Sequence, residues 1–271
     1  MNRVFCAALS MSFFAGACVS DNDDGQVGVA DSGPNAADAR GPVADAAPTA
    51  TRMFVHTNKK LYLIDDLNFS LSEIGPFDAP DGDNMTDLAV TPDGEIYTLS
   101  SSALFRVDRE TAKATKVADV SGTLNVGMTF RIDGTLLATD KNGAVRSINP
   151  QTGQVTELGE IGNGYAMAGD LVGVADGRMF AISDTGPMGN EDINNVLITI
   201  DPETGAFQES IGQIGFGRVF GSGVANGRIY AFTDEGYVIE INPSNGVGTE
   251  RGYFPNVSFW GAGVTPRAAI D

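Results

Sequence analysis

The chain has 271 residues, of which 17 are Lys or Arg and 35 are Asp or Glu, so its formal net charge at pH 7 is −18. A surface this acidic repels phosphate groups, so we expect no binding to nucleic acid and no protein-mediated binding to an anionic bilayer. With two cysteines and one histidine in the whole chain, a Cys-rich zinc site and a His-rich metal centre are excluded.

Residues 1–17 are typical of an export signal. Arg3 supplies one positive charge, an apolar run covers Val4 to Phe14, and the small residues Ala15-Gly16-Ala17 come directly before Cys18. The apolar run is too short to span a membrane. The segment resembles the lipobox of bacterial lipoproteins, in which small residues precede a cysteine that is lipidated. An ordinary secretory signal cut after Ala17 is the alternative.

The lipoprotein resemblance implies that Cys18 carries the lipid and becomes the new N-terminus. The protein would then be anchored in the cell envelope by its acyl chains. Val19 stands where some lipoproteins carry the Asp that retains them at the inner membrane, so we expect the outer membrane, with the protein periplasmic or surface-exposed. Because Cys6 lies in the signal, the folded part has no free thiol and no disulfide.

Residues 18–50 comprise the lipidated cysteine and a predicted disordered linker. The segment is built mainly from Ala, Gly, Pro, Ser and Asp, has no aromatic residue, and carries six aspartates against one arginine. Such a composition cannot bury enough apolar surface to offset the entropy of ordering. A flexible chain of this length reaches about 30 Å on average, which would let the folded part stand clear of the headgroups.

Residues 51–271 contain a repeated unit, and the repeat decides the fold class. Each unit has a hairpin turn followed by an apolar strand, and the turns are Asp93-Gly94, Asp133-Gly134, Asp176-Gly177 and Asn226-Gly227. We expect the positive φ of these pairs to make tight hairpins. A further strand then ends in an aliphatic residue plus Asp or Asn, at Asp65, Asp108, Asn149, Asp201 and Asn242. A polar turn and another strand complete a four-stranded antiparallel unit.

Five such markers predict an all-β fold with five propeller blades. They stand at 65, 108, 149, 201 and 242, so the intervals are 43, 41, 52 and 41 residues. The first unit lacks an innermost strand, and Gly263-Val264-Thr265-Pro266 near the C-terminus matches Ala89-Val90-Thr91-Pro92 of the second unit. We therefore expect the C-terminal strand to pair with the N-terminal blade and close the ring.

The apolar-Asp-Pro-x-Thr-Gly pattern followed by Asp-Gly turns resembles the NHL, YVTN and quinoprotein-like propeller repeats of bacteria. The resemblance covers residues 51–271 and implies a propeller without specifying an activity. Quinoprotein blades usually carry a tryptophan that docks the next blade, whereas Trp260 is the only tryptophan here. This departure argues against a quinone cofactor.

Ligands of a propeller are expected at the mouth of the central channel, where the loops between the second and third strands meet the connections between blades. Two of these loops are long and rich in acidic residues: 78–84, and an insertion at 184–192. We predict that they form a ligand or calcium rim with a neighbouring loop, made of Asp78, Asp81, Asp83, Asp184, Glu191, Asp192 and Asp234. Oxygen ligands of this kind suit Ca²⁺. The alternative is that these residues are simply turn formers, with no cofactor bound.

His56 occupies the strand position that Leu99, Thr139, Ile182 and Phe232 hold in the other blades. A buried core histidine is the expected reading. A catalytic role would require a carboxylate partner, and Asp234 of the neighbouring blade is the candidate. The predicted inner strands carry only two nearby acids, Asp87 and Asp170.

Three functions fit this pattern. The first is a non-catalytic, monomeric binding module that recognises a protein, peptide or glycan through the mouth loops, because a fold alone implies no activity. The second is a calcium-dependent hydrolase of lactones or esters, as in gluconolactonase-like propellers. The third is a glycosidase, which needs two carboxylates at a fixed separation. The scarcity of acids on the inner strands disfavours the third, and we place the binding module first.

Overall fold

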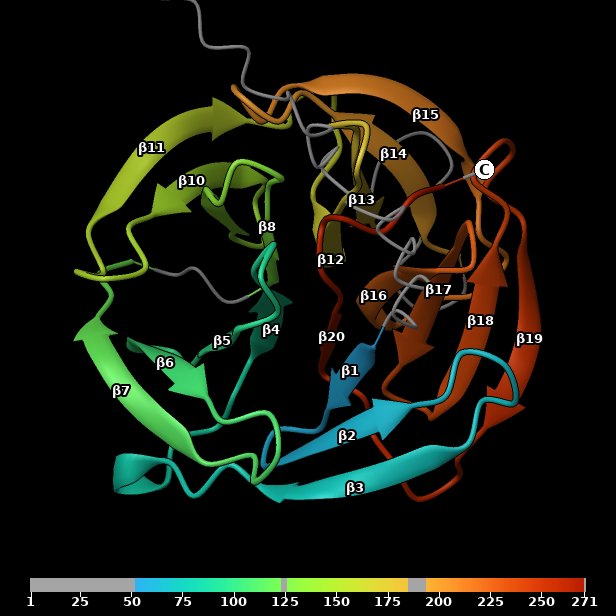
Figure 1. Ribbon diagram of the computed structural model, residues 1–271. Helices are drawn as coiled ribbons and strands as arrows, with labels where there is room; N and C mark the ends of the chain where they lie inside the picture. The colour runs from blue at the N-terminus through green and yellow to red at the C-terminus, as the bar shows by residue number, and fades with distance from the viewer. Residues whose placement is uncertain (1–51, 123–125, 185–193, 271) are drawn as a thin grey trace, which may run out of the picture. The chain divides into compact units, whose positions relative to one another are not determined.

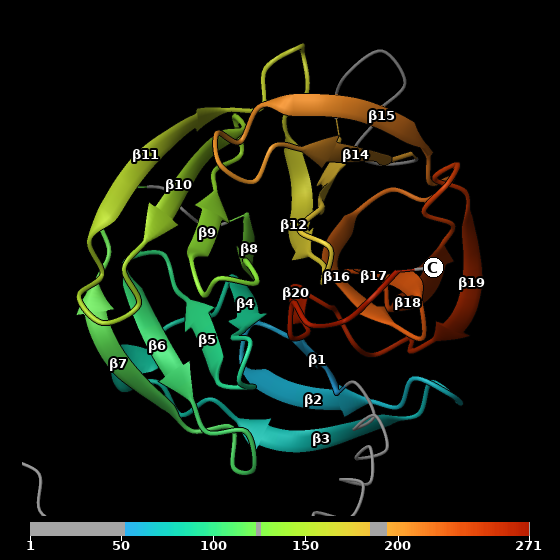
Figure 2. The same ribbon diagram turned by 45° about the horizontal axis from the view of Figure 1, so that its top comes forward.

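The computed structural model describes residues 52–122, 126–184 and 194–270, which form a five-bladed β-propeller (Figures 1 and 2). Each blade is a four-stranded antiparallel sheet, so the predicted fold class and blade count are confirmed. Within these ranges there is no helix with the length and apolarity that a membrane crossing requires. The single helical turn that the structure describes is η1 (Pro80–Gly82).

The strands of each blade run from the channel outward. Blade 1 consists of β20 (Gly261–Gly263), β1 (Met53–His56), β2 (Lys60–Ile64) and β3 (Leu71–Pro76). Blade 2 consists of β4 (Asp87–Val90), β5 (Ile96–Leu99), β6 (Ala103–Val107) and β7 (Ala114–Asp119). Blade 3 consists of β8 (Gly127–Phe130), β9 (Leu136–Thr139), β10 (Ala144–Ile148) and β11 (Val155–Glu160).

Blades 4 and 5 repeat this order. Blade 4 consists of β12 (Met167–Gly173), β13 (Met179–Ser183), β14 (Val196–Ile200) and β15 (Phe207–Gln213). Blade 5 consists of β16 (Val219–Ala225), β17 (Arg228–Thr233), β18 (Tyr237–Ile241) and β19 (Gly248–Tyr253). The inner strands β4, β8, β12, β16 and β20 therefore surround the channel (Figure 1).

The core lies between the faces of adjacent blades. Every residue of the middle strand β14 is buried, because neighbouring blades cover both of its faces. The outer strand β7 shows the contrasting pattern, with five of its six residues exposed or half-buried. The near-continuous apolar runs expected in the middle strands thus follow from the stacking of blades.

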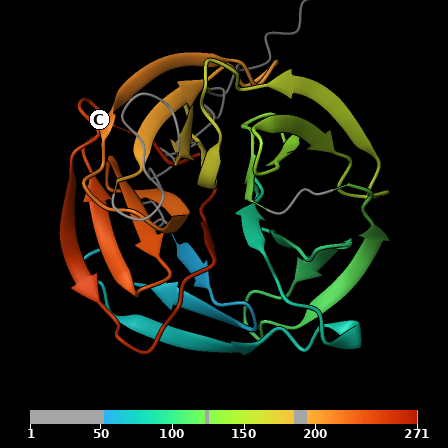
Figure 3. The ribbon, with the colours of Figure 1, turned by 180° about the vertical axis from the view of Figure 1, so that it is seen from behind.

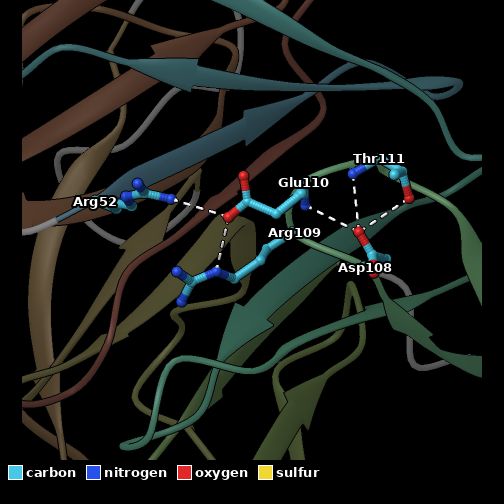
Figure 4. A network of polar contacts seen from close by, with 5 residues as sticks. All are labelled: Arg52, Asp108, Arg109, Glu110 and Thr111. Carbon is cyan, nitrogen blue, oxygen red and sulfur yellow. Dashed lines mark hydrogen bonds and ion pairs between the residues drawn. The ribbon is translucent and has the colours of Figure 1, made fainter.

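The face away from the channel mouth carries the same side-chain turn in each blade. Asp108 Oδ1 accepts hydrogen bonds from the backbone N–H groups of Glu110 and Thr111 at 3.0 and 2.9 Å, and from Thr111 Oγ1 at 2.9 Å (Figure 4). Equivalent bonds are made by Asp65, Asn149, Asp201 and Asn242. These markers therefore stabilise the polar turn that follows the third strand of each blade.

The hairpin turns differ in one detail from the prediction. In three turns only the glycine has positive φ: Gly94 at 89°, Gly134 at 88° and Gly177 at 87°. In the first of them Gly94 N–H donates to Thr91 O and Thr91 N–H to Glu95 O, which describes a three-residue loop ending in a left-handed glycine. Only Asn226 and Gly227, at 49° and 73°, form the two-residue turn with both φ values positive.

The C-terminal strand closes the ring as predicted. β20 pairs antiparallel with β1, with Gly261 opposite His56 and Gly263 opposite Phe54, and it lies between β1 and the other inner strands (Figure 3). The chain then continues across the face away from the mouth. Arg267 Nε donates to Pro92 O at 2.8 Å, and Ala175 N–H donates to Ala268 O at 3.0 Å. The last residues thereby connect turns of blades 2 and 4.

Candidate functional site

A cavity of about 320 Å³ opens at the channel mouth. Its lining residues lie at or just before the beginning of the inner strands, and all five blades contribute: Trp260 from blade 1, Thr86 from blade 2, Val126 from blade 3, Met167 and Ala168 from blade 4, and Phe220 from blade 5. Lys141 and Asp184 complete the lining. The cavity is therefore a feature of the closed ring, which no single blade could form.

The wall of this cavity is mainly apolar. Trp260 is 38% exposed and Phe220 is half-buried, whereas Met167 and Ala168 are buried. The Trp260 backbone N–H donates to His56 O at 2.8 Å, which fixes the tryptophan backbone to blade 1. Two aromatic side chains and two charged ones of opposite sign thus face one small space, a lining that suits a ligand with an apolar body and few polar groups.

The inner-strand residues just beyond the lining form the next level of the channel, which we call the floor. Strand register places four inner-strand residues at the same level. Their partners on the neighbouring second strands are as follows: Asp87 pairs with Leu99, Gly127 with Thr139, Gly221 with Phe232, and Gly261 with His56. Asp170 of β12 lies directly before Leu171, which pairs with Ala181. The glycines allow close approach of the strands, since a Cβ on Gly221 would lie 2.7 Å from the carbonyl carbon of Gly261.

Asp87 and Asp170 form a fully buried carboxyl pair on this floor. Asp170 accepts backbone hydrogen bonds from Leu171 at 2.7 Å, Ser222 at 2.9 Å and Met128 at 3.4 Å, whereas Asp87 accepts one from Leu88 at 2.8 Å. Burial raises the pKa of Asp170 to about 8, although these N–H donors favour its ionised form. Burial and the charge of Asp170 raise the pKa of Asp87 well above its ordinary value.

The two carboxyl groups lie within hydrogen-bond contact of each other, and burial favours the protonated form of both. Asp170 receives more backbone donors than Asp87, so a negative charge on the pair is better stabilised on Asp170. The Asp87 Oδ2 atom has no hydrogen-bond partner among the described residues.

His56 is fully buried beside this pair and packs edge-on against Phe77, with ring centroids 5.8 Å apart. Burial lowers its pKa from 6.5 to about 4, opposed by the hydrogen bond to Thr57 O. The imidazole is therefore neutral at pH 7. Its Nδ1 lies 2.9 Å from Thr57 O, an acceptor, so Nδ1 carries the hydrogen and Nε2 is a bare acceptor. Among the described residues Nε2 has no donor.

Gly261 lies between His56 and Asp87. A Cβ at this position would collide with both Asp87 Oδ1 and His56 Nε2, so only glycine lets these two side chains pack against the β20 backbone. Thr86 and Trp260 line the cavity and come directly before Asp87 and Gly261.

The predicted acidic rim is spread over the mouth face. Asp78 is exposed and Asp83 half-buried, while Asp81 belongs to η1, which lies at the outer edge of the propeller beside β7 (Figure 1). Asp184 lines the cavity. Asp234 is ion-paired with Arg218, whose Nε lies 2.8 Å from Asp234 Oδ1.

No group of three or more His, Cys, Asp or Glu side chains that could hold a metal occurs within residues 52–122, 126–184 and 194–270. Glu191 and Asp192 lie outside these ranges, so calcium binding by the rim stays a prediction. The proposed partner of His56 was wrong, because the carboxyl group next to Nε2 belongs to Asp87 of blade 2 and Asp234 pairs with Arg218.

Asp87 and Asp170 were predicted only as acids near the inner strands, without contact between them. The available signal was their alignment, since both occupy the level at which three other inner strands carry glycine. Their contact also bears on the glycosidase reading. Glycosidases hold their two carboxyl groups about 5–9.5 Å apart, whereas this pair is in hydrogen-bond contact, which leaves no room for a sugar between them.

Comparisons with known proteins place the fold without assigning a function. No family model matches the chain, and no curated protein matches it. A chain of a nidogen/laminin complex shares 11% identity at a TM-score of 0.54, covering 79% of this chain and 98% of that one. A symmetrical protein from a study of de novo evolutionary emergence shares 15% identity at a TM-score of 0.52, covering 80% of this chain and 99% of that one. Virginiamycin B lyase from Staphylococcus aureus shares 15% identity at a TM-score of 0.41, covering 78% of this chain and 72% of that one. At these identities the first two likenesses concern the fold alone.

Proposed function

We propose that this protein is a non-catalytic binding module, exported and anchored to the cell envelope through a lipid on Cys18, which captures its ligand at the channel mouth. The ligand is a small molecule or a single protruding group of a larger protein, peptide or glycan. The observation that carries the proposal is the cavity of about 320 Å³ to which all five blades contribute.

The size and wall of the cavity support a small, partly apolar ligand. Its volume is at the lower end of the range of about 300–1,000 Å³ found for ligand pockets. Trp260 and Phe220 supply aromatic surface, and Lys141 and Asp184 supply charge. A whole protein surface could not enter such a space, so a larger partner would present one side chain or one terminal group.

The position of the ionisable groups supports binding over catalysis. Asp87, Asp170 and His56 are the groups with the chemistry for acid–base work, and all three have an exposed fraction of 0%. None of the three lines the cavity, so a reacting bond of a ligand bound there would not contact them. The calcium-dependent hydrolase remains the alternative, resting on Asp184 together with Glu191 and Asp192.

The test uses Trp260, which is the only tryptophan in the chain and lines the cavity. Its fluorescence would be titrated with a panel of aromatic amines, aromatic acids, amino acids and sugars. We expect at least one class to change the emission saturably. Phe220→Ala should weaken that response, and Phe216→Ala is the matched control, because Phe216 is also half-buried but lies outside the lining.

Two further results would redirect the proposal. If Phe216→Ala and Phe220→Ala weaken binding equally, the cavity is not the site. If calcium raises the melting temperature and a chelator reverses the rise, a metal site is present by mass action, and ester and lactone substrates become the next assay. For the anchor, Cys18→Ser should move the protein from the membrane fraction to the soluble fraction.

A further inference from the structure

The wall of the mouth cavity has an aromatic part and an aliphatic part. Trp260 and Phe220 line it from blades 1 and 5, whereas Val126 and Met167 line it from blades 3 and 4. Blades 1 and 5 are neighbours in the closed ring, as are blades 3 and 4. A ligand in the cavity therefore meets aromatic rings on one side and aliphatic or thioether groups on another.

We propose that the cavity binds a flat aromatic ring system of about two fused rings that carries a hydrogen-bond donor at its edge. This inference rests on the proposed binding function and names the chemical class of the ligand. The rings of the ligand contact Trp260 and Phe220, and its donor group binds Thr86 Oγ1.

The volume of the cavity matches such a ring system. An apolar protein cavity of about 150 Å³ is large enough to bind benzene, and the mouth cavity has about 320 Å³. Two fused rings with one small substituent therefore fit, whereas a single ring would leave much of the wall uncovered.

The two aromatic side chains are available for contact with a ligand ring. Among the described residues neither Trp260 nor Phe220 takes part in a ring contact, whereas Phe216 already packs against Tyr237 with ring centroids 6.3 Å apart. Aromatic pairs gain affinity beyond the area that they bury. The thioether of Met167 also favours an aromatic neighbour, so the wall prefers a flat aromatic ligand to a saturated one of equal size.

Thr86 supplies a polar contact of defined direction. It is half-buried and lines the cavity, and its hydroxyl donates to Leu99 O at 3.2 Å. Because the hydroxyl hydrogen is engaged there, the oxygen offers a ligand an acceptor. Lys141 and Asp184 carry opposite charges, so the lining does not demand a charged ligand. An O–H or N–H group at the edge of the ring system satisfies Thr86.

The experiment measures the binding of three bicyclic probes of nearly equal size by equilibrium dialysis against the folded protein. 2-Naphthol has the aromatic rings and the donor. Decahydro-2-naphthol keeps the donor on saturated rings, and 2-methoxynaphthalene keeps the aromatic rings without the donor. We expect 2-naphthol to bind about tenfold more tightly than the saturated alcohol, which loses two aromatic contacts. It should bind about fivefold more tightly than the ether, which loses one hydrogen bond.

A first pair of variants tests the aromatic contacts. Phe220→Leu keeps an apolar side chain without the ring, so the preference for 2-naphthol over the saturated alcohol should fall to about threefold, with Trp260 still in place. Phe216→Leu is the matched control, because Phe216 is also half-buried but lies outside the lining. It should leave the preference unchanged.

A second set tests the donor contact. Thr86→Val removes the acceptor and should abolish the preference for 2-naphthol over the ether, whereas Thr86→Ser should retain that preference. Thr265→Val is the matched control and should leave the preference unchanged. Thr265 is also half-buried, and its hydroxyl donates to Pro92 O at 3.3 Å on the face away from the mouth.

The outcomes separate this inference from the proposed function. If 2-naphthol and the saturated alcohol bind equally and Phe220→Ala weakens both, the cavity is a binding site that does not select aromatic rings, and the inference is overturned. The same holds if no probe binds while another compound class binds at the cavity. If 2-naphthol and the ether bind equally to the unaltered protein, recognition by Thr86 is overturned. This last comparison decides alone if circular dichroism shows that Thr86→Val does not fold.

Discussion

Aspartates on the two faces of this propeller have opposite electrostatic behaviour. On the face away from the mouth, backbone hydrogen bonds lower the pKa of Asp108 and Asp201 below the ordinary value. On the channel floor, burial raises the pKa of Asp87 and Asp170. Both groups accept backbone N–H donors, so the difference comes from desolvation. For the exposed turn aspartates the backbone N–H donors have the larger effect and favour the ionised form. For the buried floor aspartates the loss of water has the larger effect and favours the protonated form.

The comparison shows that a repeat can carry two kinds of aspartate with separate roles. The turn aspartates complete a local structure, and their partners lie two or three residues away in sequence. Asp170 instead joins blades 3, 4 and 5 through Met128, Leu171 and Ser222. Asp170 on the floor therefore contributes to the cohesion of the ring.

The largest difference should appear when each kind of aspartate is replaced by alanine. Asp170→Ala leaves three buried backbone N–H groups without their acceptor and is expected to cost about 3–5 kcal/mol in the free energy of unfolding. Asp108→Ala exposes its turn donors to water and should cost much less. Urea unfolding followed by circular dichroism measures both, and equal losses would contradict the contrast drawn between the two faces.

The pH dependence of stability should sharpen the same contrast. A carboxyl group whose folded pKa is raised binds more protons in the folded state, so its contribution is lost as pH rises from the unfolded value of 3.8 toward the folded value of about 8 for Asp170. The turn aspartates act in the opposite direction, because a lowered pKa stabilises above 3.8 and loses that effect in acid.

Asp87→Asn tests this assignment. Replacing this buried carboxyl by an amide, which does not titrate, should flatten the decline in urea midpoint between pH 3.8 and about 8, whereas Asp78→Asn should leave the slope unchanged. A wild-type slope in Asp87→Asn would mean that the pair does not hold its proton in the folded state.

His56 adds a smaller effect of opposite sign. Its pKa falls from 6.5 to about 4 on folding, so the unfolded chain binds the extra proton first and stability is lost as pH falls from 6.5 to about 4. His56→Leu should remove this acid loss while leaving the alkaline decline intact. Thermal unfolding across that window gives the result, and an unchanged acid slope would show that another group is responsible.

The smallest effect is expected at the C-terminal crossing. Arg267 Nε donates to Pro92 O at 2.8 Å and its Nη2 lies 3.4 Å from Asp93, but its side chain is 62% exposed. Arg267→Ala should therefore cost about 1 kcal/mol or less. Differential scanning calorimetry can resolve this, with Arg228→Ala on β17 as a matched control for removal of an exposed arginine.

Much of the fold could be predicted because its signals are local. Five Asp or Asn markers specified five blades, and the match between Gly263 and Ala89 specified the pairing of β20 with β1. The alignment of His56 with Leu99 also predicted its burial. The turn type at Asp93-Gly94 was less accessible, since the same dipeptide suits a two-residue or a three-residue loop.

The candidate site was harder to predict. Loop length drew attention to Asp78 and the acidity of a neighbouring mouth loop to Asp234, but neither property says how far from the channel axis a side chain lies. In the structure Asp234 is paired with Arg218, and Asp78 precedes a helical turn beside the outer strand β7. The cavity instead depends on residues such as Val126 and Phe220, which carry no motif.

By itself the sequence determined the strands, the turns and the number of blades, because repeated apolar runs, turn residues and hydrogen bonds within a few residues encode them. Only the tertiary structure decided that Asp87 and Asp170, 83 positions apart in the numbering, meet as buried carboxyl groups with raised pKa values beside a neutral His56. The physical reason is that a pKa depends on the water removed by every neighbouring segment, and those segments come together only when the ring closes.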